Sequence, residues 1–507
     1  MTKNQVRVQY SGFIIFTAQI LSVITGLVFT LLLTRNMSPD QYGKWTNIFD
    51  YTGYFMLFCG MIPFWATRFV ARGKEGAIKT STLANLIIGV VAVAIYLPAI
   101  VPITNAIGTQ AYLLVYLIAG LYIFNFYLIT NFVSCLRSIK PQAIGYGLLI
   151  QEVVKVAIAL IFIVGFGQLF LGAMLSLTIS GLVQALYYTR LLAAEFKQRA
   201  KWSYLKEWFK GSTVIVYSAV GAQLLSFVFI LLFFYGGSNT RAYYQAAFTF
   251  ANIIMYSASL AFALYPKLLA KSCPENLVGD SFKTVLMLAI PLSAITIVMS
   301  TSFLTVLNVA YSVAWPVLIM LTFDTLVVMV SQFYSACLMG AEALDEEGKI
   351  PLRQLLKSKI FKVFSLQYIQ AAIALPLVFF VLTQMTLAGS VEAVVYVIAI
   401  NIGVHVSTFV GLYWFMRNSA RIPVAWVSIA KYVLASLIVA VALYLLPYPS
   451  TLFLTIAKTA LGMAFYIGLL LVIDKQARNL VRLILDEVKI TIGSFFPQKT
   501  HANDSSV

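Results

Sequence analysis

The sequence predicts an all-α, polytopic membrane protein with 14 transmembrane helices, and three observations support this fold class. Of its 507 residues, 61% are hydrophobic and only 10% are charged, whereas soluble domains carry about 25% charged residues. Apolar runs of about 20 residues, the length that crosses a bilayer as a helix, recur along the whole chain. Lys and Arg gather in every second connection between these runs. An ordinary soluble domain is therefore excluded.

The apolar runs are bounded by charges or by Gly and Pro, and they lack the alternation of membrane strands, so they predict helices. The first run follows Lys3 and Arg7, as in a secretory signal. It extends past 20 residues without a small-residue cleavage site, so we interpret it as an uncleaved span. In chain order the spans lie near 11–33, 43–66, 81–103, 111–135, 143–165, 167–189, 212–235, 244–265, 284–306, 312–338, 363–384, 391–415, 427–446 and 452–473.

The basic residues predict the orientation of the chain in a cell membrane. With a cytoplasmic N-terminus, most of the 35 Lys and Arg fall in inner connections or at the termini. The exceptions are Arg35, Lys44 and Arg241 at outer helix ends, and Lys155, Lys431 and Lys458 within spans. The positive-inside rule then places both termini in the cytoplasm. The net charge of +17 thus reflects topology and attraction to anionic inner-leaflet lipids, not nucleic-acid binding.

An internal repeat divides the chain. At an offset close to 200 residues, Tyr42 matches Tyr243, and TNFVSCL from Thr130 matches SQFYSACL from Ser331. We therefore expect two six-helix lobes in the same orientation, with the substrate path between them. Their predicted bounds are 1–200 and 201–425, followed by two additional helices in 426–473 and a cytoplasmic tail, 474–507, whose segment 475–492 predicts an amphipathic surface helix.

The outer connection between the first two spans reads as a helix start. Ser38 predicts an N-cap and Pro39 the first helical position, with Gln41 completing a capping box. Arg35 has two interpretations: a cation placed at the negative end of the first helix, or a residue at the mouth of a cavity between the lobes.

Asp50 is a charge inside the second predicted span. Counting 1.5 Å per residue from the helix start places it about 15 Å deep, where an ionisable group marks a functional candidate. No Lys or Arg is expected to pair with it, since the nearest along the sequence, Lys44, is six residues away. It shares a helix face with Asn47, Tyr51 and Tyr54, and the eighth span carries a polar stripe of its own: Gln245, Thr249, Asn252 and Tyr256. Either these faces line a shared aqueous cleft, in which Asp50 binds a coupling ion, or they form hydrogen bonds between helices.

The sequence resembles a transporter family in the segment LTRNMSPDQYG, the doubled six-helix plan and the two additional C-terminal helices. These features are similar to the polysaccharide-transporter branch of the multidrug/oligosaccharidyl-lipid/polysaccharide exporter superfamily, the Wzx-type flippases and their lipid II flippase relatives. The resemblance implies V-shaped lobes with the first, second, seventh and eighth spans lining a cavity, and turnover of a polyprenyl-linked glycan by alternating access. Such flippases commonly carry several basic residues in these spans, whereas the first, seventh and eighth spans here have none near mid-depth.

Other buried charges are further candidates. Glu152 and Lys155 stand one turn apart in the fifth span and either neutralise each other or free the Lys for a phosphate. Asp324 and His405 are both near mid-depth in the second lobe and could form a proton-linked pair. The repeat-equivalent pair Arg68 and Lys271, at inner helix ends, is expected to meet an anionic headgroup.

The leading functional hypothesis is a flippase for lipid-linked oligosaccharide, with a glycan polymerase or glycosyltransferase as possible partners. An ion-coupled drug or cation antiporter is the alternative within the same superfamily, and a membrane glycan ligase or glycosyltransferase is the alternative from another class. Short outer loops without His or acidic clusters disfavour the enzyme. There is no Walker motif, and the four cysteines lack metal-ligand spacing, so neither cofactor nor metal is expected.

Overall fold

The computed structural model describes residues 3–264, 275–340, 358–385, 389–417, 425–449, 451–475, 477–479 and 482. Helices make up almost all of this part of the chain. The first half contains α1 Lys3–Asn36, α2 Pro39–Phe55, α3 Met61–Ala71, α4 Ala77–Ala106, η1 Gln110–Tyr112, α5 Leu113–Ile139, α6 Pro141–Ala159, η2 Leu160–Gly165, α7 Leu169–Leu192, η3 Glu195–Lys197 and α8 Ser203–Gly211. The second contains α9 Thr213–Gly236, α10 Ser238–Ala251, η4 Asn252–Leu264, α12 Glu275–Val298, α13 Ser300–Leu307, η5 Val309–Ala314, α14 Trp315–Gly340, α16 Lys359–Met385, α17 Ser390–Arg417, α18 Trp426–Leu445 and α19 Leu452–Ile473.

Among the described residues, 12 helices are long and apolar enough to cross a membrane, and they correspond to 12 of the expected spans. The other two, near 43–66 and 244–265, are each divided into two successive helices, α2 with α3 and α10 with η4. Pro63 accounts for the first break, because its ring excludes an α-helical carbonyl at Cys59. The two divided spans are equivalent in the sequence repeat.

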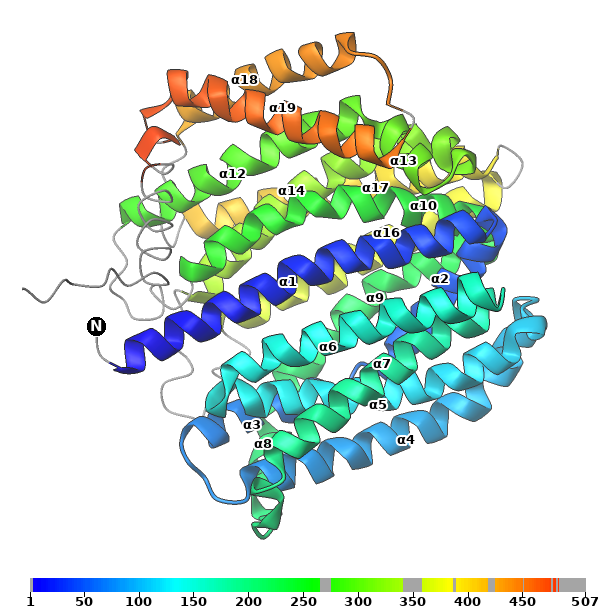
Figure 1. The fold of residues 1–507 in the computed structure, drawn as a ribbon, viewed down its shortest axis with the longest axis vertical. Helices are drawn as coiled ribbons and strands as arrows, with labels where there is room; N and C mark the ends of the chain where they lie inside the picture. The colour runs from blue at the N-terminus through cyan, green and yellow to red at the C-terminus, as the bar shows by residue number, and fades with distance from the viewer. Residues whose placement is uncertain are drawn as a thin grey trace, which may run out of the picture.

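The helices form two groups on either side of a central plane (Figure 1). Helices α4 to α7 pack on one side with α1 along them, and α12 to α17 pack on the other. The short helix α8 lies against α3 and α4 and leads directly into α9. We call the groups α1–α7 and α9–α17 the first and second lobe, and we name the inner and outer ends of the helices by the orientation expected from the sequence.

The hydrophobic cores differ between the two ends of the molecule. At the outer end a single cluster joins both lobes and contains Trp45 and Ile48 of α2 together with Ala246 of α10 and Leu307 of α13. Toward the inner end the clusters are separate. Two consist of buried residues of the first lobe and α8, and one of buried residues of the second lobe and α18–α19. Between membrane helices, close packing and interhelical hydrogen bonds provide the cohesion. The lobes are therefore held together at their outer ends.

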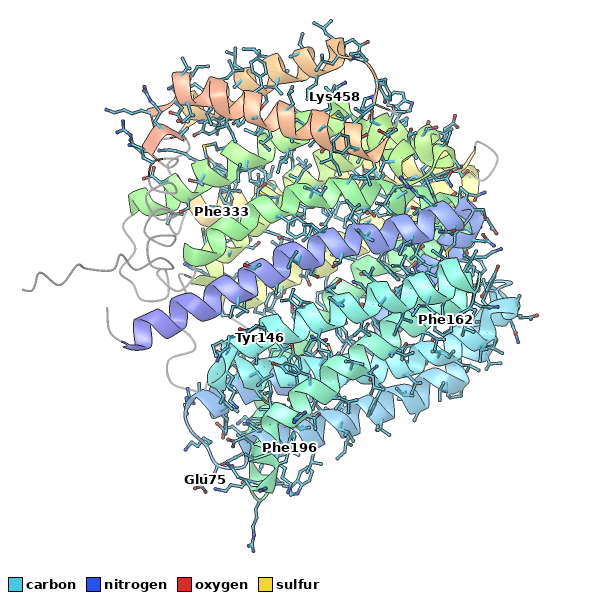
Figure 2. The ribbon with its side chains drawn as sticks, in the orientation of Figure 1. Glu75, Tyr146, Phe162, Phe196, Phe333 and Lys458 are labelled. Carbon is cyan, nitrogen blue, oxygen red and sulfur yellow. The ribbon has the colours of Figure 1, made fainter. Side chains whose placement is uncertain are left out.

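Helices α18 and α19 lie at the edge of the second lobe, where α18 packs on α12. Many of their large apolar side chains are exposed, including Tyr444 and Phe453, as expected for a lipid-facing surface. Lys458 of α19 (Figure 2) donates to the carbonyls of Leu446 and Pro447, which follow the end of α18. This cation thus binds carbonyls that the helix end leaves unpaired.

Candidate functional site between the lobes

The start of α2 has the predicted capping box. The Ser38 hydroxyl accepts from the Gln41 N–H, and the Gln41 side chain accepts from the Ser38 N–H. In the first turn, Asp40 binds Lys44 at 2.7 Å and also accepts a hydrogen bond from Ser238 of the other lobe. Burial alone would raise the pKa of Asp40, but the hydrogen bonds from Lys44 and Ser238 and the Lys44 charge lower it. Asp40 is therefore ionised at neutral pH.

Asp50 forms a buried ion pair across the two lobes. Its two carboxylate oxygens accept from Nε and Nη2 of Arg241, both at 2.8 Å. Each side chain is only 5% exposed. The Arg241 Nη1 donates to Gln245 at 3.0 Å, and the guanidinium lies 4.6 Å from the ring centroid of Phe229. Paired, bidentate geometry of this kind satisfies both charges in a buried site.

The expectation that Asp50 has no cation partner is wrong, and the reason is the register between α2 and α10. Ser238 at the start of α10 packs against Gly43 in the second turn of α2, where a Cβ would overlap the Ser238 carbonyl. This offset moves Arg241 inward along α2, so its side chain reaches Asp50. In the sequence, Arg241 stands at an outer helix end and contributes only to the topology pattern.

The polar stripe of α2 packs against protein, although the Asn47 Nδ2 has no hydrogen-bond partner among the described residues. Asn47 is fully buried and accepts from the Tyr116 hydroxyl. Tyr51 is 9% exposed, and the Tyr54 hydroxyl donates to the Gln223 carbonyl of α9. These contacts correspond to hydrogen bonding between helices, the second of the two interpretations.

The stripe of the eighth span continues from the ion pair toward the inner end. Thr249 donates to the carbonyl of Gln245 within α10. Beyond the helix break, Asn252 is half-buried and Tyr256 is 50% exposed. The inner part of this stripe is thus the more accessible one.

A second set of contacts joins the lobes at α1 and α13. Arg35 donates to the Val306 carbonyl from Nε at 3.2 Å and from Nη2 at 3.1 Å. Nearby, Asn308 donates to the carbonyl of Thr34. Val306 is in the last turn of α13, whose carbonyls lack partners within the helix. Arg35 therefore binds the negative end of a helix in the other lobe, not of its own.

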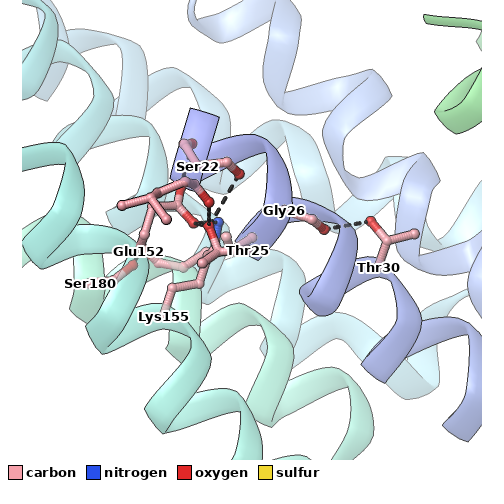
Figure 3. A network of polar contacts seen from close by, with 9 residues as sticks. Ser22, Thr25, Gly26, Thr30, Glu152, Lys155 and Ser180 are labelled. Carbon is pink, nitrogen blue, oxygen red and sulfur yellow. Dashed lines mark hydrogen bonds and ion pairs between the residues drawn. The ribbon is translucent and has the colours of Figure 1, made fainter. Parts of the chain in front are cut away.

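Glu152 and Lys155 form the predicted pair within α6, with Lys155 Nζ and Glu152 Oε2 2.6 Å apart. Both side chains are buried. Ser22 and Thr25 of α1 also donate to the Glu152 carboxylate (Figure 3). The charges are thus neutralised, and the pair connects α1 to the rest of the first lobe.

Asp324 and His405 are in direct contact, as the sequence suggested. The Asp324 Oδ1 lies 2.6 Å from the His405 Nδ1, between α14 and α17. Asp324 is 6% exposed. Both α14 and α17 pack against α10, the helix that carries Arg241. The second lobe therefore places this pair on two helices that pack against the helix providing Arg241 to the ion pair between the lobes.

Of the two residues in the expected inner basic pair, Arg68 lies within the described part of the chain. The Arg68 guanidinium lies 3.7 Å from the Phe64 ring centroid, and Nη1 donates to the Phe64 carbonyl. Lys271 lies outside the described residues. Most of the predicted surface helix 475–492 lies outside them as well.

Comparison with known proteins supports this architecture. Residues 10–272 match the polysaccharide biosynthesis protein family, whereas the search of curated proteins found no match. The lipid II flippase MurJ, in an inward closed conformation, is 16% identical to this chain, with a TM-score of 0.61. The match covers 92% of this chain and 100% of the MurJ chain. An inward-facing multidrug resistance MATE family transporter has 13% identity and a TM-score of 0.60, with coverage of 79% and 96%. An outward-facing MATE family transporter is 15% identical, with a TM-score of 0.55, and the match covers 82% of this chain and 96% of the transporter. The chain thus shares their fold.

Proposed function

Because this chain belongs to the polysaccharide biosynthesis protein family, we propose that it is a flippase for polyprenyl-phosphate-linked or polyprenyl-pyrophosphate-linked oligosaccharide. It moves this lipid from the cytoplasmic to the outer leaflet by alternating access, and so supplies glycan for a cell-surface polysaccharide. The lipid II flippase MurJ, whose fold the chain shares, gives a precedent for such a substrate. Enzymes that attach or polymerise the glycan are the proposed partners.

The observation that carries the proposal is the ion pair between Asp50 and Arg241. It lies between two lobes whose apolar cores merge only toward the outer end. A gate must be closed in one state and open in another, and a buried ion pair meets this need. Its Coulomb attraction offsets desolvation while the gate is closed, and its charges regain water when the gate opens. The two states then differ little in free energy.

The anionic headgroup enters from the cytoplasmic side in this proposal. Arg68, held by the Phe64 ring and carbonyl, makes the first contact together with Lys271. Arg241 is a phosphate ligand only after the lobes separate, because in the closed state its donors bind Asp50 and Gln245. This order of contacts places successive cations along the path of the phosphate.

Asp324 and His405 are the proposed proton-coupling pair. The carboxylate and the imidazole are in direct contact and can exchange a proton, and α14 and α17, which carry them, pack against α10, the helix that carries Arg241 of the gate. Asp50 is the alternative coupling site; its bidentate pairing with Arg241 supports a role in the gate.

The test is a flipping assay in proteoliposomes. A fluorescent polyprenyl pyrophosphate glycan in the inner leaflet should reach the outer leaflet with the wild-type protein, and His405→Gln should flatten the dependence of the rate on a pH gradient. A fluorescent cationic drug serves as the comparison substrate. Transport of the drug without movement of the glycolipid would reject the flippase in favour of an antiporter.

A further inference from the structure

The first lobe contains a pocket of about 270 Å³ between α5, α6 and α7. It lies in the inner half of these helices, close to the ends at Ile139, Pro141 and Leu192. The side chain of Phe126, which lines it, is 37% exposed, so the pocket reaches the protein surface. Neither the gate nor the coupling pair uses it.

The lining combines aromatic rings with amides. The rings and amides are Tyr122, Phe126, Tyr188, Asn125, Gln151 and Gln184, and the remaining lining residues are aliphatic or glycine. No charged side chain is among them. Amides at this depth in a membrane lobe are costly unless they have partners.

Two of the amides have hydrogen-bonding capacity to spare. Gln184 is 3% exposed and donates to the Tyr188 hydroxyl, yet its Oε1 has no partner among the described residues. The Gln151 side chain makes no hydrogen bond within the described chain either. An unpaired buried acceptor costs about 1–3 kcal/mol, which a ligand hydroxyl or amide N–H would recover.

The composition of the pocket selects among ligand classes. A cation requires a free carboxylate, and the carboxylate next to Gln151, Glu152, is already neutralised by Lys155. A phosphate requires a free cation, and the lining supplies none. An alkyl chain has no use for three amides. A neutral sugar ring presents hydroxyls to amides and C–H faces to aromatic rings, so it fits all of these features.

We propose that this pocket binds one neutral sugar ring of the lipid-linked glycan, an assignment that rests on the proposed flippase function. The volume limits the occupant to about one ring, because pockets for drug-sized ligands occupy about 300–1,000 Å³. The Glu152–Lys155 pair, directly after Gln151 in the chain, connects this wall of the pocket to α1 through Ser22 and Thr25. A ligand in the pocket would therefore lie next to the contact that joins α1 to the rest of the first lobe.

Two substitutions change the pocket with little effect on the fold. Gln151→Leu removes an amide that has no hydrogen bond to lose. Gly181→Ala adds a methyl group to the lining, and the new Cβ would lie 3.5 Å from Ile129 Cδ1 and 3.6 Å from Asn125 Cβ, ordinary contact distances. Gly468→Ala in α19 is the matched control, because its Cβ would meet nothing within 4 Å.

The test compares two lipids, bare polyprenyl pyrophosphate and polyprenyl pyrophosphate carrying one N-acetylhexosamine, by the quenching of intrinsic fluorescence in detergent. The wild-type protein should bind the glycosylated lipid more tightly. Gln151→Leu and Gly181→Ala should each weaken that binding about three- to tenfold, the size of one hydrogen bond, and leave binding of the bare lipid unchanged. Gly468→Ala should alter neither.

Equal affinity of the wild-type protein for the two lipids, or unchanged affinity in both pocket variants, would overturn the sugar-pocket assignment. Either result is separate from the flippase proposal, which fails only if the wild-type protein does not move the glycolipid in proteoliposomes.

Discussion

Asp50 and Arg241 form a contact in which two residues from different lobes neutralise each other in a buried site. Both carboxylate oxygens and three guanidinium nitrogens have partners. The loss of one partner leaves the other charge buried and uncompensated, which typically costs about 3–5 kcal/mol. The removal of both charges costs much less. The pair therefore predicts a strongly non-additive response to mutation.

We accordingly expect Asp50→Asn to lower the stability of the protein by about 3–5 kcal/mol. Asp50→Asn combined with Arg241→Gln should restore most of it, because no isolated charge remains. Thermal unfolding of the two single variants and the double variant, monitored by size-exclusion chromatography, measures this coupling. Independent, additive losses in the double variant would show that the two side chains do not depend on each other.

The sequence reveals residue contacts only where they are local or where depth restricts the choice of partner. Glu152 and Lys155 are one turn apart on a single helix, so their pairing follows from helix geometry. Asp324 and His405 are rare polar groups at similar depth in one lobe. The Asp50–Arg241 pair needs the register between two lobes, which no local pattern contains. The repeat does provide one signal, since it aligns Arg241 with Asp40, residues of opposite charge.

At the scale of elements, the contact between α2 and α10 depends on close approach of two backbones. Gly43 allows it, because any Cβ there would overlap the Ser238 carbonyl. Overpacking of this kind costs about 1–3 kcal/mol, and the free energy would be recovered by separation of the helices. The state with open outer ends should therefore gain population when Gly43 carries a side chain.

The corresponding variant is Gly43→Ala, examined with a cysteine at Thr46, which is buried one turn further along α2. Labelling of this cysteine by a membrane-impermeant maleimide should accelerate about tenfold, in line with the cost of overpacking. Gly411→Ala in α17 is the control, since its Cβ would meet nothing within 4 Å. Equal labelling rates in the two variants would mean that the small size of Gly43 does not control closure of the outer ends of the lobes.

The sequence predicted the elements well where composition alone decides. Long apolar runs such as Ala77–Ala106 and Leu452–Ile473 are helices of the expected extent. The second and eighth spans were expected as single helices, yet each is divided. Pro63 gave a signal for the first break, but a proline in a membrane span also occurs within continuous helices, as Pro98 and Pro102 do in α4.

At the scale of the whole molecule, two lobes share one apolar core at the outer end and have separate cores toward the inner end. The repeat in the sequence predicted two bundles, but it could not show at which end they meet. That property depends on contacts between residues of both lobes, such as the Arg35 side chain with the Val306 carbonyl and Asp40 with Ser238. The proposed alternating access requires these outer contacts to break during each cycle.

The most direct test of this account locks the outer contact. Asp40→Cys and Ser238→Cys, in a background without the four native cysteines, would be joined by a short, reducible bis-thiosulfonate reagent. Thr67→Cys with Ser138→Cys is the control, because Ser138 donates to the Thr67 carbonyl within the first lobe.

In proteoliposomes, cross-linking of positions 40 and 238 should stop movement of the lipid-linked glycan, and reduction should restore it, while the control pair remains active throughout. Undiminished flipping by protein that is fully cross-linked at the outer ends would contradict alternating access through this interface.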